Sequence, residues 1–356
     1  MSLPFIADDG APPRPACDRT AKEVLGWART RLDPALREVV ERLPPGMRRI
    51  AGYHFGWLDA AGRPAAAVAA GKAMRPALVL LCAEAVGGHA DRAIPAAVAV
   101  ELAHNFSLLH DDVMDGDELR RHRPTVWAVF GTADAILAGD VLLSLAFDEL
   151  ARSQGDDAAH GTAARRLNAA VTELVRGQSE DCGFQNRNDV GLAECLEMAR
   201  GKTAALIACA CALGGLYGGD DEQVDRLWRF GMHAGLAFQL VDDLLGIWGD
   251  PRVTGKPAGA DLRVRKKSLP VVAALTSDTP AGRRLARVYH GDRPLDDAAI
   301  EHAKELIEEA GGRSWARDRA GHELATAAEW LAAASPRRAP AAELRGLTDL
   351  IAGRSS

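Results

Sequence analysis

The segment ELAHNFSLLHDDVMDGDELRR, residues 101–121, carries carboxylates at helical spacing. Asp111 and Asp115 are four residues apart, so in a helix their Cβ atoms lie about 5–6 Å from each other on one face. His104, seven residues before Asp111, returns to nearly the same face. Stacked carboxylates repel each other, and the C-terminal end of a helix disfavours negative charge. Alone, this pattern fits solvated acids at a helix end at least as well as a chemical site.

A second apolar segment, GLAFQLVDDLLGIWGDP (residues 235–251), repeats the feature. Gln239, Asp242, Asp243 and Gly246 are spaced so that they share one face of a helix. Carboxylates after so apolar a turn would be costly to desolvate without a partner. Mg²⁺ is a hard ion that is usually shared between one or two carboxylates and the phosphates of a substrate. Two acidic helices that face each other therefore indicate a site for Mg²⁺ ions and a diphosphate.

Basic residues flank both acidic segments, as a diphosphate site requires. Lys72 and Arg75 precede an apolar helix, Arg120 and Arg121 directly follow the first acidic motif, and Lys202 and Thr203 form a Gly-Lys-Thr sequence. A Gly- and Pro-rich segment after the second motif resembles a mobile lid over a phosphate. Its cations are Lys256, Arg263, Arg265, Lys266 and Lys267. Arginine suits forked phosphate contacts, whereas lysine acts as a point charge.

Long stretches rich in Ala, Leu, Val, Arg and Glu must position these side chains. Few runs alternate with period two, so the sequence predicts an all-α protein built as one large helical bundle. Residues 1–18 are predicted to be disordered, and 19–356 to form the single domain. The predicted helices span residues 20–43, 74–86, 92–114, 134–153, 161–181, 192–213, 221–248, 268–276, 296–311 and 315–334.

Composition excludes several classes of protein. The net charge of the 356 residues is −6, without a long basic run, which argues against nucleic-acid binding. The N-terminus lacks the basic-then-apolar order of a signal peptide, and no apolar run is long enough to span a membrane. Six scattered cysteines without metal-site spacing indicate reduced, mostly buried thiols. A cytoplasmic enzyme is expected.

Taken in order, these motifs resemble those of the trans-isoprenyl diphosphate synthases, the polyprenyl synthetase family, and in particular its actinobacterial geranylgeranyl-producing members. The resemblance covers roughly residues 40–335 and rests on GKAMRP, HNFSLLHDDVMD with the following Arg-Arg, GKT, FQLVDD, TGKP and RKKS. It implies a helical bundle around a deep central cavity, and a homodimer. It also implies Mg²⁺-dependent condensation of isopentenyl diphosphate with an allylic diphosphate to give a linear all-trans prenyl diphosphate.

The resemblance also implies roles for individual residues. Metal binding is carried over to Asp111, Asp115 and Asp242, with Asp112 and Asp243 in support. Isopentenyl diphosphate would be held by Lys72, Arg75, His104 and Arg121. The allylic diphosphate would be held by Arg120, Lys202, Thr203, Gln239, Lys256 and Lys266, of which Lys202 and Lys256 would also assist catalysis. The third carboxylate of the family's second DDxxD motif is replaced here by Gly246, which puts full occupancy of a third metal site in doubt.

Product length is a further expectation from the resemblance. Phe106, with the small Ser107 and no insertion in the motif, matches the pattern of members that make the C20 product, geranylgeranyl diphosphate; C15 and C25 are the alternatives. Phe106 lies about 7.5 Å along the helix from Asp111, but roughly 140° off its face. Ser107 lies on the aspartate face itself.

Two other functions remain open at this point. A class I terpene cyclase shares the helical fold and ionises an allylic diphosphate with Mg²⁺. Such an enzyme has no use for a second diphosphate site, which Lys72, Arg75 and His104 would provide. A regulatory subunit of a partner synthase is the other alternative, supported by the altered second motif and opposed by the complete first one.

Overall fold

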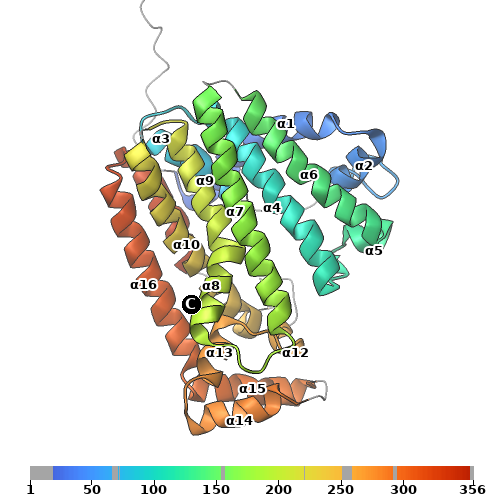
Figure 1. Ribbon diagram of the computed structural model, residues 1–356, viewed down its shortest axis with the longest axis vertical. Helices are drawn as coiled ribbons and strands as arrows, with labels where there is room; N and C mark the ends of the chain where they lie inside the picture. The colour runs from blue at the N-terminus through green and yellow to red at the C-terminus, as the bar shows by residue number, and fades with distance from the viewer. Residues whose placement is uncertain are drawn as a thin grey trace, which may run out of the picture.

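The computed structural model describes residues 19–65, 71, 73–153, 157–219, 221–250, 259–291 and 295–352, and most of them are helical (Figure 1). The first part of the chain forms α1 (Ala21–Glu41), α2 (Pro45–His54), α3 (Met74–Ala85), a 3₁₀ turn (Ala90–Ala93), α4 (Ile94–Asp115), the short strands β1 (Leu119–Arg120) and β2 (Arg123–Pro124), α5 (Val126–Phe130) and α6 (Thr132–Arg152). The second part forms α7 (Asp157–Phe184), α8 (Leu192–Ala199), a π-helical turn (Arg200–Ala204), α9 (Ala205–Leu216), α10 (Asp221–Trp248), α12 (Ala260–Arg263), α13 (Leu269–Leu275), α14 (Pro280–Tyr289), α15 (Asp297–Glu309), α16 (Gly312–Ala333) and α17 (Arg338–Ala352).

The predicted all-α bundle is confirmed, and each predicted helix is present. Sequence periodicity missed the short helices α2, α5, α12 and α14 and the C-terminal α17. The predicted disordered residues 1–18 lie outside the described residues. The stretch predicted as one helix over 192–213 is interrupted by the π-helical turn, which the hydrophobic pattern does not reveal.

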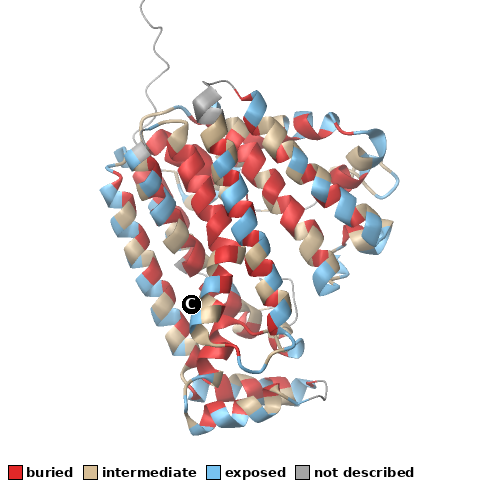
Figure 2. Cartoon of the chain, in the orientation of Figure 1, coloured by how far each residue is buried: buried red, intermediate tan, exposed pale blue. Residues whose placement is uncertain are grey.

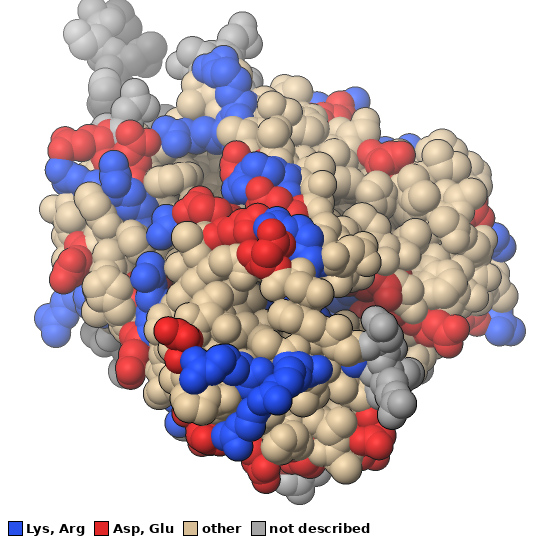
Figure 3. Space-filling view, turned by 60° about the horizontal axis from the view of Figure 1, so that its bottom comes forward, with Lys and Arg blue, Asp and Glu red and all other residues tan. Residues whose placement is uncertain are grey.

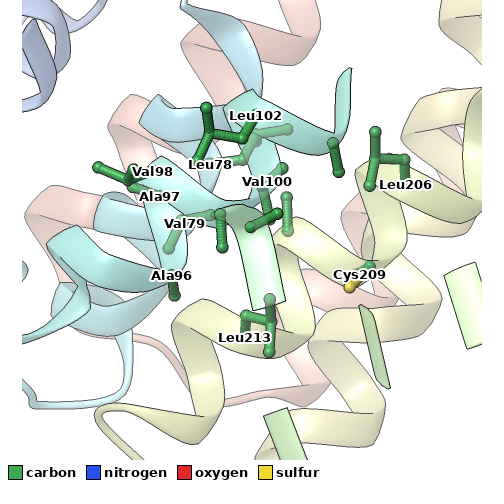
Figure 4. Close-up of a cluster of buried hydrophobic side chains, with 14 of the residues drawn as sticks. Leu78, Val79, Ala96, Ala97, Val98, Val100, Leu102, Leu206, Cys209 and Leu213 are labelled. Atoms are coloured by element: carbon green, nitrogen blue, oxygen red, sulfur yellow. The ribbon is translucent and has the colours of Figure 1, made fainter. Parts of the chain in front are cut away.

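The core is centred on α9, whose residues from Ala205 to Gly215 are all buried. A helix that is apolar all round must be enclosed by others, and α3, α4, α7 and α10 pack around it (Figure 2). Gly214 permits a close approach to α3, because a Cβ there would collide with the carbonyl oxygen of Val79. Figure 4 shows the cluster formed by α3, α4 and α9, with Leu78, Val100 and Leu213 among its members.

The cysteines behave as predicted in the described part of the chain. Cys82, Cys195, Cys209 and Cys211 are buried, Cys182 is half-buried, and all five are free thiols. Cys17 lies outside the described residues. Among the described helices, none combines the length, the apolar character and the low number of charges that crossing a membrane requires.

The long helices run roughly side by side, and the short helices α12–α15 lie at one end of the bundle (Figure 1). The end of α4 carries the first acidic motif, and the end of α10 carries the second. Seen from that end, acidic side chains gather near the middle of the surface, with basic side chains directly beside them (Figure 3).

Candidate active site

The C-terminal turns of α4 face the end of α7 and the π-helical turn. Lys202 forms an ion pair with Asp181 of α7 at 2.6 Å (Nζ to Oδ2), and both side chains are largely buried. Burial raises the pKa of Asp111 to about 6, with Lys202 opposing the shift and Asp115 adding to it. Burial likewise raises the pKa of Asp115, where Lys202 again opposes the shift and Asp181 adds to it. Asp111, Asp115 and Asp181 thus share the single ammonium group of Lys202, whose one positive charge cannot balance three carboxylates.

The π-helical turn positions Lys202 and Thr203 beside the carboxylates at the end of α4. It lies tightly against α7, since a Cβ on Gly177 would collide with the backbone nitrogen of Lys202. A Cβ on Gly201 would come within 2.7 Å of the carbonyl oxygen of Glu173. Single π turns inside helices are frequent at functional sites, because they shift the register of the side chains that follow.

A chain of hydrogen bonds joins the π-helical turn to the second acidic motif. Thr203 Oγ1 donates to Gln239 Oε1 at 2.5 Å, and Gln239 Nε2 donates to Asp243 Oδ1 at 2.7 Å. The backbone N–H of Leu269, at the start of α13, donates to Asp243 Oδ2 at 2.9 Å. Burial raises the pKa of Asp243 to about 7 although these bonds favour its ionised form. Asp243 is therefore a buried carboxylate that holds Gln239 and the start of α13 in place, whereas Asp242 is exposed on the surface of α10.

Lys266 lies among the carboxylates beside the second motif. Burial alone would lower its pKa, but the charges of Asp261 and Asp243 more than offset burial and raise it. Asp261 belongs to α12 and occupies the space next to Gly246, where a Cβ would collide with Asp261 Oδ2. The position that carries the third carboxylate in the family's motif is thus filled by a carboxylate from another element.

The basic half of the site lies further back along α4. His104 Nε2 is 3.1 Å from Arg75 Nη1. Burial, followed by the charges of Arg75 and Arg121, lowers the pKa of His104 far below its usual value, so the ring is neutral. Burial also lowers the pKa of Arg75 to about 10, although Glu101 favours its charged form. The His104 ring thus contacts the Arg75 guanidinium and lies near that of Arg121, and the Glu101 carboxylate favours the charged form of both arginines.

Arg121 reaches this region from the turn between β1 and β2. Both Arg121 and His122 have positive φ angles (52° and 62°), as the central residues of a tight hairpin require. A Cβ on Gly71 would come within 2.6 Å of the Arg121 guanidinium, which places Arg121 against that loop. Such strained backbone in non-glycine residues is typical of functional sites.

Arg120 faces the other way and anchors the first motif. Its Nε donates to Asp112 Oδ1 at 2.7 Å, and Asp112 is buried. A small, partly open cavity lies between α2, α4 and the hairpin, and its lining includes His54, Asp112, Arg120, Arg121 and Arg123. This cavity is cationic along one wall.

The structure brings most of the predicted residues together in two groups. The acidic group contains Asp111, Asp115, Asp242, Lys202, Thr203, Gln239 and Lys266, and the basic group contains Arg75, His104 and Arg121, with Arg120 between them. Lys72 and Lys256 lie outside the described residues. Of the lid cations, Arg263 is not in the site, because it pairs with Asp297 at the surface.

Sequence reasoning missed Asp181, Asp261 and Glu101. None of the three has another acid three or four residues away, which is the spacing that marked Asp111 and Asp115. Asp261 stands in the basic segment of which only the cations were considered. A search for acids close to the Gly-Lys-Thr lysine in space, rather than in sequence, would have found Asp181.

The two chain-length candidates lie on the inner part of α4. Phe106 is 6% exposed, and its ring meets that of His110 edge-on at 4.7 Å between centroids. His110 Nε2 in turn donates to the carbonyl oxygen of Ile136 on α6 at 3.0 Å. Ser107 is buried, and its hydroxyl donates to the carbonyl oxygen of His104 at 2.8 Å. Phe106 thus contributes to the contact between α4 and α6.

Among the described residues no group of three or more acids, histidines or cysteines is closed around a metal position. Mg²⁺ does not need one, because it commonly takes one or two carboxylates from the protein and the rest of its ligands from phosphates and water. Burial, with a smaller contribution from the neighbouring carboxylates, raises the pKa of Asp111 and Asp115 although Lys202 opposes the shift, so a hard divalent cation would stabilise their ionised forms. The donor set therefore fits Mg²⁺.

Comparison with known proteins agrees with this geometry. A sequence profile described as polyprenyl synthetase matches residues 60–307. The chain belongs to the polyprenyl synthetase family. The crystal structure of a polyprenyl synthetase from Streptomyces coelicolor is similar to it, with a TM-score of 0.88 and 47% identity over 93% of this chain and 99% of that one.

Two curated relatives of the same family come from Mycobacterium tuberculosis. A (2E,6E)-farnesyl diphosphate synthase is 48% identical over 98% of both chains. A geranylgeranyl diphosphate synthase is 45% identical over 94% of both chains. Both are named diphosphate synthases, and neither is named a cyclase. This polyprenyl synthetase family chain is accordingly a prenyl diphosphate synthase.

Proposed function

We propose that the protein condenses isopentenyl diphosphate with an allylic diphosphate in a Mg²⁺-dependent reaction. The observation that carries the proposal is the division of α4 into two chemically opposite parts. Asp111 and Asp115 face Lys202 at one end, and His104 lies near Arg75 and Arg121 further along. Two substrates that each bear a diphosphate need two binding sites. In one, metal ions bridge the carboxylates and the diphosphate, and in the other, basic side chains bind the diphosphate directly.

The residues divide the work as follows. Mg²⁺ held by Asp111, Asp115 and Asp242 would stabilise negative charge on the leaving diphosphate. Lys202, Thr203, Gln239, Lys266 and Arg120, together with Lys256, bind and orient the allylic diphosphate. Arg75, His104 and Arg121, together with Lys72, hold isopentenyl diphosphate. Because His104 is neutral, it binds a diphosphate oxygen by hydrogen bonding, and the two arginines supply the charge.

The bond changes need no side-chain nucleophile. The allylic C–O bond breaks, and its electron pair leaves with the diphosphate, whose charge the surrounding cations stabilise. The π-bond of isopentenyl diphosphate then forms the new C–C bond to the allylic cation. A proton lost from the adjacent carbon, to the released diphosphate, restores a double bond.

We propose further that Asp261 takes over the place of the missing third carboxylate of the second motif. Its carboxylate lies against Gly246, and its charge raises the pKa of Lys266. Gly246 is then a requirement of this arrangement, because any side chain there would displace Asp261. The altered motif therefore does not support a regulatory subunit without activity.

Replacing Arg75 or His104 with alanine is expected to raise KM for isopentenyl diphosphate about tenfold to a hundredfold, with little change in KM for the allylic substrate. The loss of one hydrogen bond involving a charged group corresponds to about 1.5–3 kcal/mol. Steady-state kinetics with each substrate varied in turn measure both constants, and the exposed Arg92→Ala serves as the matched control. Conversion of an allylic diphosphate alone into a cyclic hydrocarbon would instead establish a cyclase.

We propose geranylgeranyl diphosphate, the C20 compound, as the main product. Overall identity does not decide between C15 and C20, because the farnesyl and geranylgeranyl diphosphate synthases are 48% and 45% identical to this chain. The proposal therefore rests on Phe106 and Ser107. Phe106 is buried on α4 between one and two turns before Asp111, where it packs against His110. Ser107 places only a small side chain on the aspartate face.

Phe106→Ala is expected to lengthen the product by one or more C5 units, because it opens space beside α4. Ser107→Phe is expected to shorten the product toward C15, because an aromatic ring would fill the space on the aspartate face. Chromatography of the dephosphorylated alcohols separates these products. The two substitutions are each other's control, since they should act in opposite directions. An unchanged distribution in both would show that α4 does not set the length.

We propose that the enzyme acts as a cytoplasmic homodimer. The exposed large apolar side chains include Val129 on α5 and Ile136 and Leu137 on α6, which lie near one another in the chain and are typical of an interface. The five described cysteines are free, as is usual for proteins of a reducing compartment. Light scattering on the purified protein measures the assembly state directly.

A further inference from the structure

Lys266 and its neighbour Lys267 have different surroundings. Both lie in the non-helical segment before α13. Lys266 lies among the carboxylates of the acidic group. Lys267 instead lies over the ring of Tyr289 at 5.1 Å (Nζ to centroid) and lines a separate, partly open cavity between α13, α14 and the loop before α8. None of the residues assigned to either substrate lines this second cavity.

Lys267 is a buried cation without a counter-ion in the described part of the chain. The residue is 4% exposed, and no described carboxylate lies within 4.0 Å of its ammonium group. Burial, followed by the charge of Arg265, lowers its pKa, and no carboxylate acts in the other direction. The nearest acid on the cavity lining, Asp189, is exposed and is held by Arg187 at 2.9 Å. A largely buried lysine without a carboxylate partner is unusual in a folded protein, and here only the face of the Tyr289 ring lies beside its charge.

A second unsatisfied group faces the same cavity. His290 Nε2 is buried and has no hydrogen-bond partner, and Lys267 lies close enough to affect the pKa of His290. Buried polar atoms without a partner are rare, and each calls for a ligand, a water or a functional reason. The rest of the lining is largely apolar, with Val272 completely buried and Leu275 and Ala286 beside it.

We propose that this cavity is a second anion-binding site, distinct from the active site, for a small diphosphate that carries a short apolar group. The Lys267 ammonium and the His290 Nε2–H donate to the anionic end. Leu275 and Ala286 contact the apolar group, with Val272 packed behind them. A ligand with one anionic and one apolar end matches a lining that combines two basic side chains with apolar ones. The site does not depend on the proposed reaction.

Isothermal titration calorimetry in excess EDTA tests the proposal, because removing divalent ions disables the metal-dependent site. The protein carries Arg75→Met, which weakens the other cationic site, and the ligands are isopentenyl diphosphate and inorganic diphosphate. Adding Lys267→Met is expected to weaken binding at least tenfold, whereas the exposed Lys22→Met should leave it unchanged and Lys267→Arg should largely preserve it. Tighter binding of the ester identifies the organic diphosphate as the ligand, and equal binding identifies the free diphosphate group.

The thermal stability of the ligand-free protein separates binding from a structural role. Lys267→Met removes an uncompensated charge, so its Tm should equal or exceed that of the parent. Either ligand should raise the Tm of the parent and not that of Lys267→Met. His290→Ala provides a second variant with the same expected loss of binding. Isotherms that are identical with and without Lys267→Met and His290→Ala would overturn the proposal.

Discussion

Asp111→Ala and Asp115→Ala are each expected to lower turnover by about a thousandfold or more. Metal ions typically stabilise the charge of a transition state by several kcal/mol, and about 4 kcal/mol corresponds to three orders of magnitude in rate. Incorporation of radiolabelled isopentenyl diphosphate in Mg²⁺ buffer measures the loss. Glu118→Ala is the matched control, because Glu118 is an exposed carboxylate just beyond the motif.

The fold should survive the loss of Asp111. Its pKa is raised to about 6, so at neutral pH its charge disfavours the folded state in the absence of metal. The Tm of metal-free Asp111→Ala should therefore equal or exceed that of the wild type, and Mg²⁺ with diphosphate should stabilise only the wild type. Near-normal product formation by either variant would contradict the metal assignment.

Gly246→Asp, which restores the third acid of the second motif, is expected to impair the enzyme about tenfold to a hundredfold. The new side chain would collide with Asp261 Oδ2 and place a like charge beside it. Overpacking at such a site costs about 1–3 kcal/mol, which accounts for a change in rate of this size. The Mg²⁺ dependence of the rate and the stabilisation by Mg²⁺ with diphosphate provide two independent readouts.

A double-mutant cycle makes this prediction specific. Asp261→Ala alone should also weaken the stimulation of the rate by Mg²⁺. Gly246→Asp combined with Asp261→Ala should recover most of that stimulation, because one carboxylate again occupies the space between α10 and α12. Gly321→Asp, at an exposed glycine of α16 with open space around it, controls for the added charge. Full activity of Gly246→Asp alone would show that Asp261 does not act at this position.

Local periodicity was sufficient to predict most of the long helices and the principal acidic faces. The spacing of Asp111 and Asp115 places them on one face of α4 whatever the rest of the chain does. The all-α architecture follows from the same helical period and from the scarcity of alternating runs. Short helices such as α2 and α14 escaped because each has only 10 residues, which is fewer than three helical turns and leaves few repeats of the period to recognise.

The tertiary structure alone decided which lone side chains join those faces. Lys202 meets Asp181 only because the π-helical turn lies against α7, and a single inserted turn leaves no mark in the hydrophobic pattern. Asp261 lies against Gly246 because α12 packs on α10. Neighbouring Lys266 and Lys267 have different surroundings for the same kind of reason, the first among the acidic group and the second at the separate cavity. Spacing along one helix fixes the direction in which each side chain leaves the helix axis. Contacts between separate elements depend instead on packing that sequence periodicity does not encode.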